Sequence, residues 1–303
     1  MENKPLISII MNCFNSDSYL KEAIDSVIAQ TYQNWEIIFW DNQSTDNSAS
    51  IVQSYNDKRI RYFYAPEHTS LGEGRNQALQ KARGEYISFL DCDDVYFPSK
   101  LEKNLLAFEN ETIGLIYSNG YTHFQEQNKK RPFYTALQVK GFVYEKWLAS
   151  YQVMIPSVMF RKKVLEGMNY WFDKRFSMIE EFDFFMRVAQ TWKINYIDEK
   201  LCLWRSHQAS LSKTKRELFE KENRIFLEDI LKQTPALEKE EFIKKFRAKI
   251  AYQTFYNQWF FANKNERHTL LEHIAVEPRL GVVYLFSWFP KIFFKQFLYF
   301  LGK

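Results

Sequence analysis

The chain has 303 residues, of which 46% are hydrophobic and 26% charged, which excludes a disordered protein and allows one large domain or one domain with an appendage. Its net charge of +4 is modest and the basic residues of the second half alternate with glutamates, so we expect no nucleic-acid partner. Three widely spaced cysteines argue against a disulfide framework or a thiolate metal site and are typical of a reducing compartment.

The first hundred residues alternate between the periodicities of strands and helices. Short apolar runs predict strands over residues 6–11, 35–40, 59–64 and 85–90. Apolar residues at helical spacing predict helices over residues 19–30, from Ser44 or Thr45 to about residue 55, and over residues 70–82. This order predicts an α/β fold with a mostly parallel central sheet and helices on both faces.

The pattern loosens beyond residue 100. We expect strands over residues 113–117 and 194–197, a helix over 179–189, and a loop or hairpin over 125–142. From residue 213 to 272 the pattern is helical and rich in Glu and Lys. We therefore divide the chain into a domain over 1–212, with halves of about 1–100 and 101–212, and a helical C-terminal region over 213–303.

Three carboxylates, Asp91, Asp93 and Asp94, follow directly behind the apolar run 86–90. Open α/β sheets bind ligands at the carboxyl ends of their strands, where this cluster is expected to lie. Carboxylates this close repel one another unless a cation intervenes, and Mg²⁺ or Mn²⁺ prefer such oxygen ligands and bridge them to phosphates. The alternative is a solvated acidic turn in which Asp94 or Ser99 caps the next helix.

Two further side chains stand at the ends of predicted strands. Asp41 ends the second strand, where it can accept a hydrogen bond from a nucleobase N–H or a ribose hydroxyl, or cap the turn that follows. Phe14 lies just past the first strand, where its ring can stack on a nucleobase or pack as an ordinary core residue. Three successive strand ends thus carry an aromatic ring, an acid and an acidic cluster.

In combination, these segments resemble the inverting glycosyltransferases of family 2, which have the GT-A fold. The matching stretches are residues 9–15, 29–32, 40–46, 74–76 and 84–94, in the order and roughly the spacing of the family. The resemblance extends over about two-thirds of the chain and fades after Ser212. It implies a nucleotide-sugar donor, first of all a UDP-sugar, with Mn²⁺ or Mg²⁺ as the cofactor.

The resemblance also implies roles for single residues. Phe14 would stack on the uracil, and Asp41 would receive the N3–H of the base. Arg75 would face the base and the phosphates. Asp91 would hold ribose or sugar hydroxyls, and Asp93 would ligate the metal ion on the diphosphate.

The chain departs from the family at two positions in the same donor site. Asn12, which we also assign to donor binding, stands where the family often has Pro. Asn42 replaces a second Asp after Asp41. Neither departure removes a residue on which the prediction depends, but both leave the base preference open.

Sugar transfer by single displacement needs a carboxylate that takes the proton of the acceptor hydroxyl. The candidates are Glu180, Glu181 and Asp183, although acids at the start of a helix also complement the helix dipole. The segment resembles the Glu-Asp-x-Asp stretch of the family, whose catalytic Asp aligns with Glu181. We predict Glu181 as the base and keep Asp183 as the alternative, because Glu181 is one methylene longer than the family's residue.

Residues 204–210 resemble the Arg-x-His segment that follows the last core strand of the family. The resemblance implies that His207 supplies a nitrogen to the metal ion or a donor to the diphosphate. Arg205 is a phosphate partner or a surface charge. Outside such a motif, a single His is more often a structural residue.

Residues 280–301 form an apolar and aromatic tail that Pro290, Lys291 and Lys295 interrupt. The tail is barely long enough to span a bilayer, which needs about 20 apolar residues. The two lysines are four residues apart, opposite the phenylalanines, which favours an amphipathic helix at a membrane surface. The alternative is a helix that packs on the rest of the chain or on a partner subunit.

The sequence as a whole predicts a metal-dependent inverting glycosyltransferase that moves a sugar from a UDP-sugar to a hydroxyl of a glycan or lipid-linked acceptor in surface polysaccharide synthesis. Residues 1–5 run straight into the first strand without a signal peptide, so we expect a cytoplasmic protein, monomeric or oligomeric, held peripherally at the inner face of the cell membrane. Two rivals are a non-catalytic nucleotide- or glycan-binding protein on the same fold and a sugar nucleotidyltransferase. The second is disfavoured because residues 11–20 contain no Gly, Lys or Arg to grip phosphates.

Overall fold

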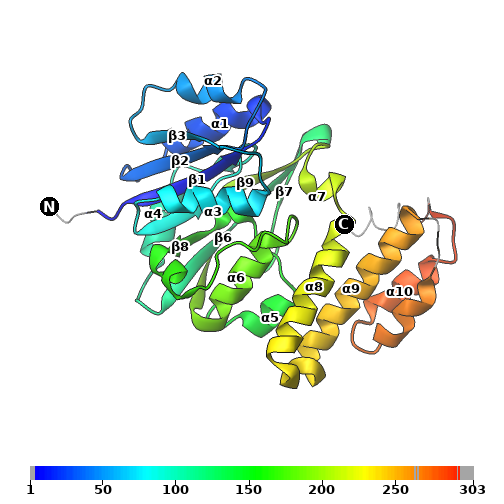
Figure 1. Cartoon of the computed structure of the whole chain (residues 1–303). Helices are drawn as coiled ribbons and strands as arrows, with labels where there is room; N and C mark the ends of the chain where they lie inside the picture. Colours follow the sequence, from blue (N-terminus) through cyan, green and yellow to red (C-terminus); the bar gives the residue numbers. More distant parts are fainter. Residues whose placement is uncertain (1–3, 263, 265, 292, 294–303) are drawn as a thin grey trace. The chain divides into compact units, whose positions relative to one another are not determined.

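The computed structural model describes residues 4–262, 264, 266–291 and 293 (Figure 1). The chain divides into two compact units. One consists of Met1–Tyr144 and Gln152–Thr214, and the other of Glu145–Tyr151 and Lys215–Lys303. The first unit contains the β-sheet, and the second is helical.

Parallel strands and helices alternate at the start of the first unit (Figure 1). The elements are β1 (Ile7–Cys13), α1 (Asp17–Ile28), β2 (Trp35–Asp41), α2 (Ser48–Gln53), β3 (Ile60–Tyr64), α3 (Leu71–Lys81) and β4 (Tyr86–Phe89). The four strands lie in the order β3-β2-β1-β4. The predicted alternation of strands and helices is therefore confirmed.

The alternation of side chains along β1 explains why helices cover both faces of this sheet. Ile9 and Met11 point to one face and share a core cluster with Leu20 of α1. Asn12 points to the other face, where α3 packs so closely that a Cβ on Gly74 would lie 2.8 Å from the Asn12 Nδ2 atom. Glycine at this position lets the helix approach the ends of β1 and β2.

The rest of the sheet is mixed. The remaining elements of this part of the chain are β5 (Val95–Tyr96), α4 (Lys100–Leu106), β6 (Ile113–Phe124), η1 (Gln125–Gln127), β7 (Lys129–Pro132), α5 (Tyr144–Ala149), η2 (Ile155–Ser157), β8 (Met159–Arg161), η3 (Lys162–Gly167), α6 (Glu180–Thr191), β9 (Lys193–Ser206) and α7 (Leu211–Thr214). The full strand order is β3-β2-β1-β4-β8-β6-β9-β5, with β7 paired to β6. Strand β8 is antiparallel to β4 and β6, whereas β6 and β9 are parallel to each other.

Two strands extend further than the sequence predicts. Strand β6 continues past Tyr117 to Phe124, and β9 continues past Ile197 to Ser206. The two strands pair along most of this length, with register shifts. Polar residues interrupt the apolar pattern on which the prediction rested, but the pairing tolerates them because they are bonded; the Asn119 amide, for example, bonds to the backbone of Tyr134. Strand β7 pairs with β6 in antiparallel orientation, so the segment predicted as a loop or hairpin begins as a hairpin.

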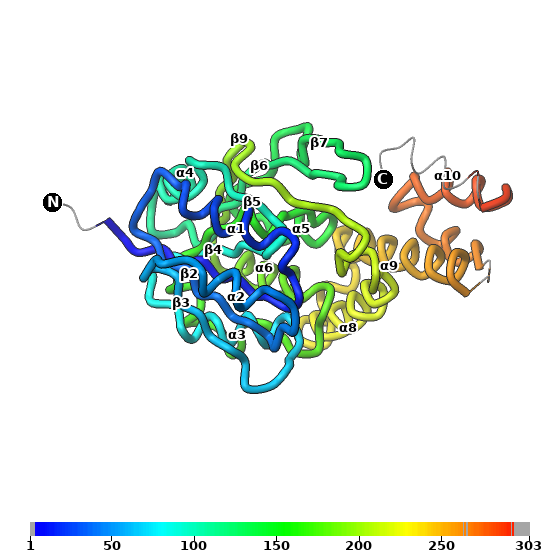
Figure 2. The backbone as a smooth tube through the Cα atoms, turned by 90° about the horizontal axis from the view of Figure 1, so that it is seen from above, coloured from blue at the N-terminus to red at the C-terminus, as the bar shows by residue number. Residues whose placement is uncertain are grey.

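The second unit is built on two long helices, seen beside each other in Figure 2. Its main elements are α8 (Leu218–Gln233), η4 (Pro235–Lys239), α9 (Glu241–Phe260), η5 (Arg267–His273) and α10 (Arg279–Phe286). Phe255, Trp259, Leu270, Leu280 and Val283 form its core around α9 and α10. The predicted tail over 280–301 begins within α10, and its residues 292 and 294–301 lie outside the described residues. Within the described part of the chain, no helix is long and apolar enough to cross a membrane.

Candidate active site

The ends of three neighbouring strands meet at one edge of the sheet. Cys13 of β1 pairs with Asp41 of β2, and Ile10 of β1 pairs with Phe89 of β4. The residues that follow these strands therefore lie side by side, at the edge where open α/β sheets bind ligands. The structure thus brings together the strand-end residues predicted for the donor site: Asn12, Phe14, Asp41, Asp91 and Asp93.

Phe14 is half exposed at this edge, with 50% of its surface accessible. Its ring centroid lies 4.4 Å from that of His68, at an interplanar angle of 58°. The Nδ1 atom of His68 lies 2.9 Å from the carbonyl oxygen of Asn42, and because that carbonyl can only accept, Nδ1 carries the proton. An exposed aromatic ring backed by an imidazole offers a flat surface to a planar ligand.

Asp41 is fully buried, and both of its oxygens already have protein partners. Oδ1 accepts from the Ser44 N–H at 2.8 Å, and Oδ2 accepts from the Tyr62 hydroxyl at 2.7 Å. The carboxylate therefore shapes the turn after β2, which is the simpler of the two roles considered above. A contact to a nucleobase stays a prediction and would use the remaining lone pairs.

Asn12 has an unusual environment. Within the described part of the chain, neither the oxygen nor the nitrogen of its side-chain amide has a hydrogen-bond partner, although both atoms are buried. The indole N–H of Trp40, the residue that pairs with Asn12 across β1 and β2, is buried without a partner as well. Buried polar groups left unpaired cost about 1–3 kcal/mol each. These groups mark a place where a polar ligand or a water molecule would bond.

The three acids behind β4 have different partners. Asp91 accepts from the Arg75 guanidinium at 3.1 Å, and Asp93 lies 2.9 Å from Nε2 of His207. Asp94 is buried and accepts from the backbone N–H of Arg205 at 2.9 Å. Burial, followed by the charge of Asp93, raises the pKa of the Asp94 carboxyl. Asp94 is thus a structural anchor, whereas Asp91 and Asp93 remain partly accessible, at 33% and 31% of their side-chain surface.

Asp93 and His207 are the residues that fit a metal ion. Within the described residues, no group of three or more His, Cys, Asp and Glu side chains could hold an ion by itself. A carboxylate oxygen and an imidazole nitrogen nevertheless suit Mn²⁺, and both side chains are partly accessible from solvent. The pair would therefore need oxygen atoms of a bound ligand to complete the coordination, as is common for Mg²⁺ at phosphate sites.

Arg75 lies in the interior, with only 2% of its surface accessible. Its guanidinium donates to Glu180 at 2.8 Å and to Asp91 at 3.1 Å. It therefore connects the acidic end of β4 to the start of α6. A contact of this side chain with the base or the phosphates stays a prediction, and its burial between two carboxylates weighs against it.

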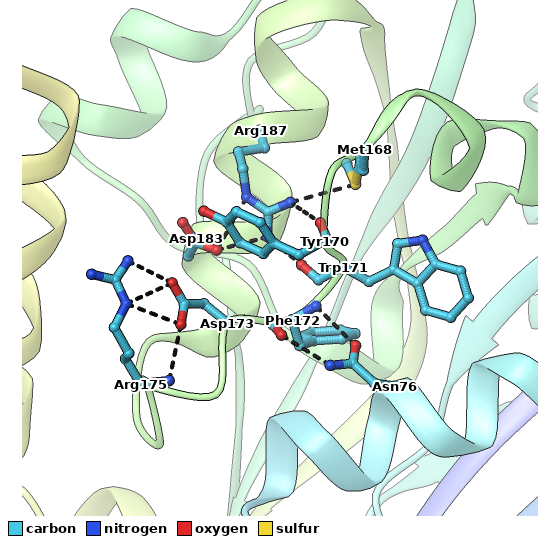
Figure 3. A network of polar contacts seen from close by, with 9 residues as sticks. All are labelled: Asn76, Met168, Tyr170, Trp171, Phe172, Asp173, Arg175, Asp183 and Arg187. Atoms are coloured by element: carbon cyan, nitrogen blue, oxygen red, sulfur yellow. Dashed lines mark hydrogen bonds and ion pairs between the residues drawn. The ribbon is translucent and has the colours of Figure 1, made fainter. Parts of the chain in front are cut away.

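The three carboxylates at the start of α6 also have distinct surroundings. Glu180 is bonded to Arg75, and Asp183 accepts from Arg187 at 2.7 and 3.1 Å (Figure 3). No hydrogen bond or ion pair of the Glu181 carboxylate occurs within the described part of the chain. Burial raises the pKa of Glu181 to about 8, although the nearby charge of Arg75 opposes the shift.

A catalytic base needs the properties that Glu181 has. A carboxylate with a raised pKa and free lone pairs can accept a proton from a bound hydroxyl near neutral pH. Burial raises the pKa of Asp183 too, but the ion pair with Arg187 opposes this shift and engages the Oδ2 atom of the carboxylate. Of the two candidates, Glu181 is the one whose carboxylate makes no ion pair within the described residues, and its role as the base stays a prediction.

The comparison with known proteins identifies the chain. The model of the family described as Glycosyl transferase family 2 matches residues 8–168. The chain belongs to glycosyl transferase family 2. It is 32% identical over 213 residues to an uncharacterised glycosyltransferase of Methanocaldococcus jannaschii, which covers 67% of this chain and 71% of that protein. It is also 36% identical over 114 residues to an Escherichia coli UDP-Glc:alpha-D-GlcNAc-diphosphoundecaprenol beta-1,3-glucosyltransferase, WfgD, which covers 38% of this chain and 45% of WfgD.

Solved structures of glycosyltransferases share the fold. The structure of S. aureus TarS 1–349 in complex with UDP-GlcNAc has a TM-score of 0.70 at 17% identity, over 93% of this chain and 86% of that one. The mannosyltransferase PcManGT from Pyrobaculum calidifontis in complex with GDP-Man and Mn²⁺ has a TM-score of 0.60 at 16% identity, over 93% and 76% of the two chains. At these identities the likeness concerns the fold alone, and it confirms the predicted GT-A fold. The family model and the similarity to the M. jannaschii protein show that the chain is a glycosyltransferase.

The sequence did not predict how two side chains organise this family 2 site. Arg205, which was considered as a phosphate partner or a surface charge, is buried. Arg205 donates to the Asp93 carbonyl at 2.8 Å and to Glu22 at 2.6 Å, and its guanidinium lies 4.4 Å from the Tyr19 ring centroid. These contacts assign Arg205 to the support of the acidic loop. His68 was missed as well, because it lies in a polar loop without periodicity.

Proposed function

We propose that this glycosyltransferase is a metal-dependent, inverting enzyme that transfers a sugar from a UDP-sugar to a hydroxyl of a glycan or lipid-linked acceptor in surface polysaccharide synthesis. The observation that carries the proposal is the unengaged carboxylate of Glu181 on the helix that Arg75 ties to Asp91. Two names among similar proteins support the donor class: WfgD acts with UDP-Glc, and TarS was crystallised with UDP-GlcNAc.

The donor would bind along the strand ends. The exposed ring of Phe14 supplies a stacking surface for the base, and the unpaired Asn12 amide offers one donor group and one acceptor to its polar edge. Asp91 retains lone pairs for ribose or sugar hydroxyls beside its bond to Arg75. Asp41 would contribute through its remaining lone pairs, while it holds the turn that supports the base.

Asp93 and His207 would hold Mn²⁺ or Mg²⁺ on the diphosphate. When bound, such an ion stabilises the negative charge that develops on the leaving nucleoside diphosphate. PcManGT, which shares the fold, was solved with Mn²⁺ and GDP-Man. Arg205 contributes by fixing the backbone of Asp93, whose carbonyl it binds.

Glu181 would act as the general base. Its carboxylate accepts the proton of the acceptor hydroxyl while that oxygen attacks the anomeric carbon and the bond to the nucleoside diphosphate breaks. A single displacement of this kind inverts the anomeric configuration. Asp183, bonded by Arg187, would keep α6 in place and take no proton.

We also propose that the second unit contacts a membrane surface from the cytoplasmic side. Around α10, large apolar side chains are exposed while the opposite face of the helix is buried. The exposed residues are Val282, Leu285, Trp288, Phe289 and Phe293. The guanidinium of Arg267 lies 3.9 Å from the Trp288 ring, which is the combination of aromatic and cationic groups that suits a lipid headgroup region. The acceptor named for WfgD is carried by a polyprenyl lipid, which supports a membrane-borne acceptor.

The donor assignment is tested by nucleotide binding followed by turnover. Titration calorimetry with UDP, GDP and CDP, each with and without Mn²⁺, should show tight binding of UDP that depends on the metal ion. UDP-sugars are then screened by UDP release, and the anomeric configuration of the product is read by NMR. A retained configuration would refute the inverting mechanism. Binding of UDP without turnover of any UDP-sugar, in the presence of isolated cell membranes as acceptor source, would favour the non-catalytic binding protein instead.

The membrane contact is tested separately. The full-length protein should sediment with vesicles of phosphatidylglycerol and phosphatidylethanolamine, and the double variant Leu285→Ser/Trp288→Ser should stay in the supernatant. Leu211→Ser, at an exposed position of the first unit, is the matched control and should sediment like the wild type. Equal sedimentation of all three proteins would refute the contact.

A further inference from the structure

Asn76 of α3 bonds to the backbone of a residue 96 positions further along the chain. Its Nδ2 donates to the carbonyl oxygen of Phe172 at 2.9 Å, and its Oδ1 accepts from the N–H of Phe172, also at 2.9 Å (Figure 3). The side-chain amide therefore satisfies both backbone groups of Phe172, as a neighbouring strand would. Asn offers a donor and an acceptor together at this short reach.

The Phe172 side chain lies between β4, the strand that leads to Asp91, and α6, the helix that carries Glu181. The ring is buried and stacks on Phe184 of α6, with centroids 4.8 Å apart and an angle of 20°. The ring also meets Phe89, the last residue of β4, in an edge contact at 5.7 Å, and the Arg75 guanidinium lies 5.7 Å from its centroid. The position of Phe172 therefore sets how α6 lies against the strand that carries Asp91.

A second helix holds the same segment of the chain. The Arg187 guanidinium of α6 donates to the carbonyl oxygen of Tyr170 at 2.7 Å and also to that of Trp171 (Figure 3). The same guanidinium binds Asp183 one helical turn earlier. Residues 170–172 are thus fixed from both sides, by α3 through Asn76 and by α6 through Arg187.

Arg75, the residue before Asn76, makes the parallel connection. It binds Glu180 at the start of α6 and Asp91 behind β4. Consecutive residues of α3 therefore join α6 and the loop that precedes it to the donor half of the site. Glu181 lies between these points of attachment, next to Glu180 and three residues before Phe184.

We propose that Asn76 is a positioning residue that places Glu181 relative to the donor by clamping Phe172 against α6. The proposal rests on the assignment of Glu181 as the base. Asn76 need not touch the substrate, because a shift of about 1 Å in a reacting group can cost 10²-fold in rate. Its loss should therefore lower turnover and leave nucleotide affinity unchanged, which a contact with the nucleotide would not do.

The test compares Asn76→Ala, Asn76→Asp and the wild type. Asn76→Asp keeps the acceptor for the Phe172 N–H and the volume of the side chain, but it places a carboxylate oxygen against the Phe172 carbonyl. The two oxygens repel each other, so this variant should lower kcat at least as much as Asn76→Ala, and it serves if Asn76→Ala does not fold. The matched control is Gln77→Ala on the same helix, since Gln77 donates to Glu73 at the helix surface. Three quantities are measured: the Kd of UDP with Mn²⁺, the kcat and KM for the UDP-sugar found in the screen, and hydrogen exchange of the backbone over residues 168–173.

For Asn76→Ala we expect a kcat lower by about 30- to 100-fold, a UDP Kd within about twofold of the wild type, and exchange at Phe172 that is faster by about tenfold or more. Gln77→Ala should match the wild type in all three. An unchanged kcat with faster exchange overturns the positioning role, and a UDP Kd that weakens in step with kcat makes Asn76 a ligand contact instead. A wild-type protein that binds no UDP and releases none overturns the proposed function together with this inference.

Discussion

The donor edge of the sheet and the start of α6 are built in opposite ways. At the donor edge, the backbone register of β1, β2 and β4 sets the positions of the side chains. Two of these side chains are not fully engaged by the protein: the Asn12 amide has no hydrogen-bond partner within the described residues, and the Phe14 ring is half exposed. On α6, side chains hold one another, and Glu180 and Asp183 are each bound to an arginine. Glu181 is the exception, since its carboxylate is not among these pairs.

This difference separates groups that support the site from groups that act in it. A carboxylate held by an arginine has its lone pairs directed at the protein, and removing it leaves a buried charge without compensation. A buried carboxylate or amide without a hydrogen-bond partner lowers the stability of the protein as long as no ligand is bound. Removing a group of the first kind should therefore damage folding, and removing one of the second kind should damage activity alone.

The sharpest test is the pair of substitutions Glu181→Gln and Asp183→Asn. Glu181→Gln removes the proposed base and should lower the transfer rate by about 10²- to 10⁴-fold, with the UDP Kd unchanged. It should also raise Tm by about 2–4 °C, because it removes a carboxylate whose ionised form is disfavoured by burial. Asp183→Asn should lower the free energy of unfolding by about 3 kcal/mol, since Arg187 loses its charged partner.

Steady-state transfer assays and thermal melts on both variants decide between the two roles. A fully active Glu181→Gln, together with an inactive but stable Asp183→Asn, would exchange the roles of the two carboxylates. Glu199→Gln serves as the control, because this exposed carboxylate pairs with Lys103 away from the site and should change neither quantity.

The metal pair gives the next largest effect. Asp93→Asn should lower the transfer rate by about 10²-fold or more and abolish the stabilisation by UDP and Mn²⁺, because Asp93 is one of the two side chains proposed to hold the ion. Chelation by EDTA should reduce the wild type to the same level. Asp198→Asn, at an exposed position of β9, should behave like the wild type. Wild-type activity that survives EDTA would remove the metal ion from the mechanism.

Strand ends could be predicted from the sequence because buried strands have a recognisable apolar pattern. An apolar run of five or six residues indicates a buried strand, and the residues at its end must lie at the sheet edge, as Phe14, Asp41 and Asp91 do. The acidic start of α6 was found in another way, through its resemblance to the Glu-Asp-x-Asp stretch of the family. The resemblance also favoured Glu181 as the base with Asp183 as the alternative, but the sequence did not show that Asp183 is paired with Arg187.

What the sequence did not predict depends on contacts between distant residues. Arg205 binds Glu22, 183 positions away, and Asn76 binds Phe172, 96 positions away. No local period reports such a pair, because each depends on how elements pack after they have formed. The partner of Asp183, Arg187, is only four residues away. A carboxylate and an arginine at that spacing also occur on exposed helix faces, so the spacing alone did not indicate a buried ion pair.

The pH dependence of transfer should report the free carboxylate directly. Because the pKa of Glu181 is raised to about 8, the base is protonated at pH 6 and 7, so kcat/KM should rise about tenfold per pH unit and level off above pH 8. Arg75 opposes this shift, so Arg75→Gln should move the rise to higher pH if the protein folds. Measurements from pH 6 to 9.5 suffice, and a flat profile would exclude Glu181 as the group that limits the rate.

The smallest effect concerns Lys100 of α4, a fully buried cation beneath the donor edge. Its ammonium donates to Ser88 and to the Val158 carbonyl oxygen at 3.2 Å, and burial lowers its pKa to about 7. In the unfolded chain this amine titrates near pH 10.4, so between about pH 7 and 10 the unfolded state binds the extra proton. The free energy of unfolding should therefore rise with pH between about pH 7 and 10, and the contribution of this group should stay constant below about pH 7, where both states are protonated.

Lys100→Met removes the titrating group and keeps most of the volume, so the difference in Tm between variant and wild type should be largest at pH 7, at about +2 to +4 °C, and shrink toward pH 9.5. Lys103→Met on the exposed side of the same helix should show a difference that does not vary with pH. Because Ser88 keeps its bonds to Tyr96 and to the Val158 carbonyl, the strand that leads to Asp91 should stay in place and transfer should continue. A loss of transfer at unchanged Tm would instead make Lys100 part of the site, and would show that a fully engaged group can also act in the chemistry.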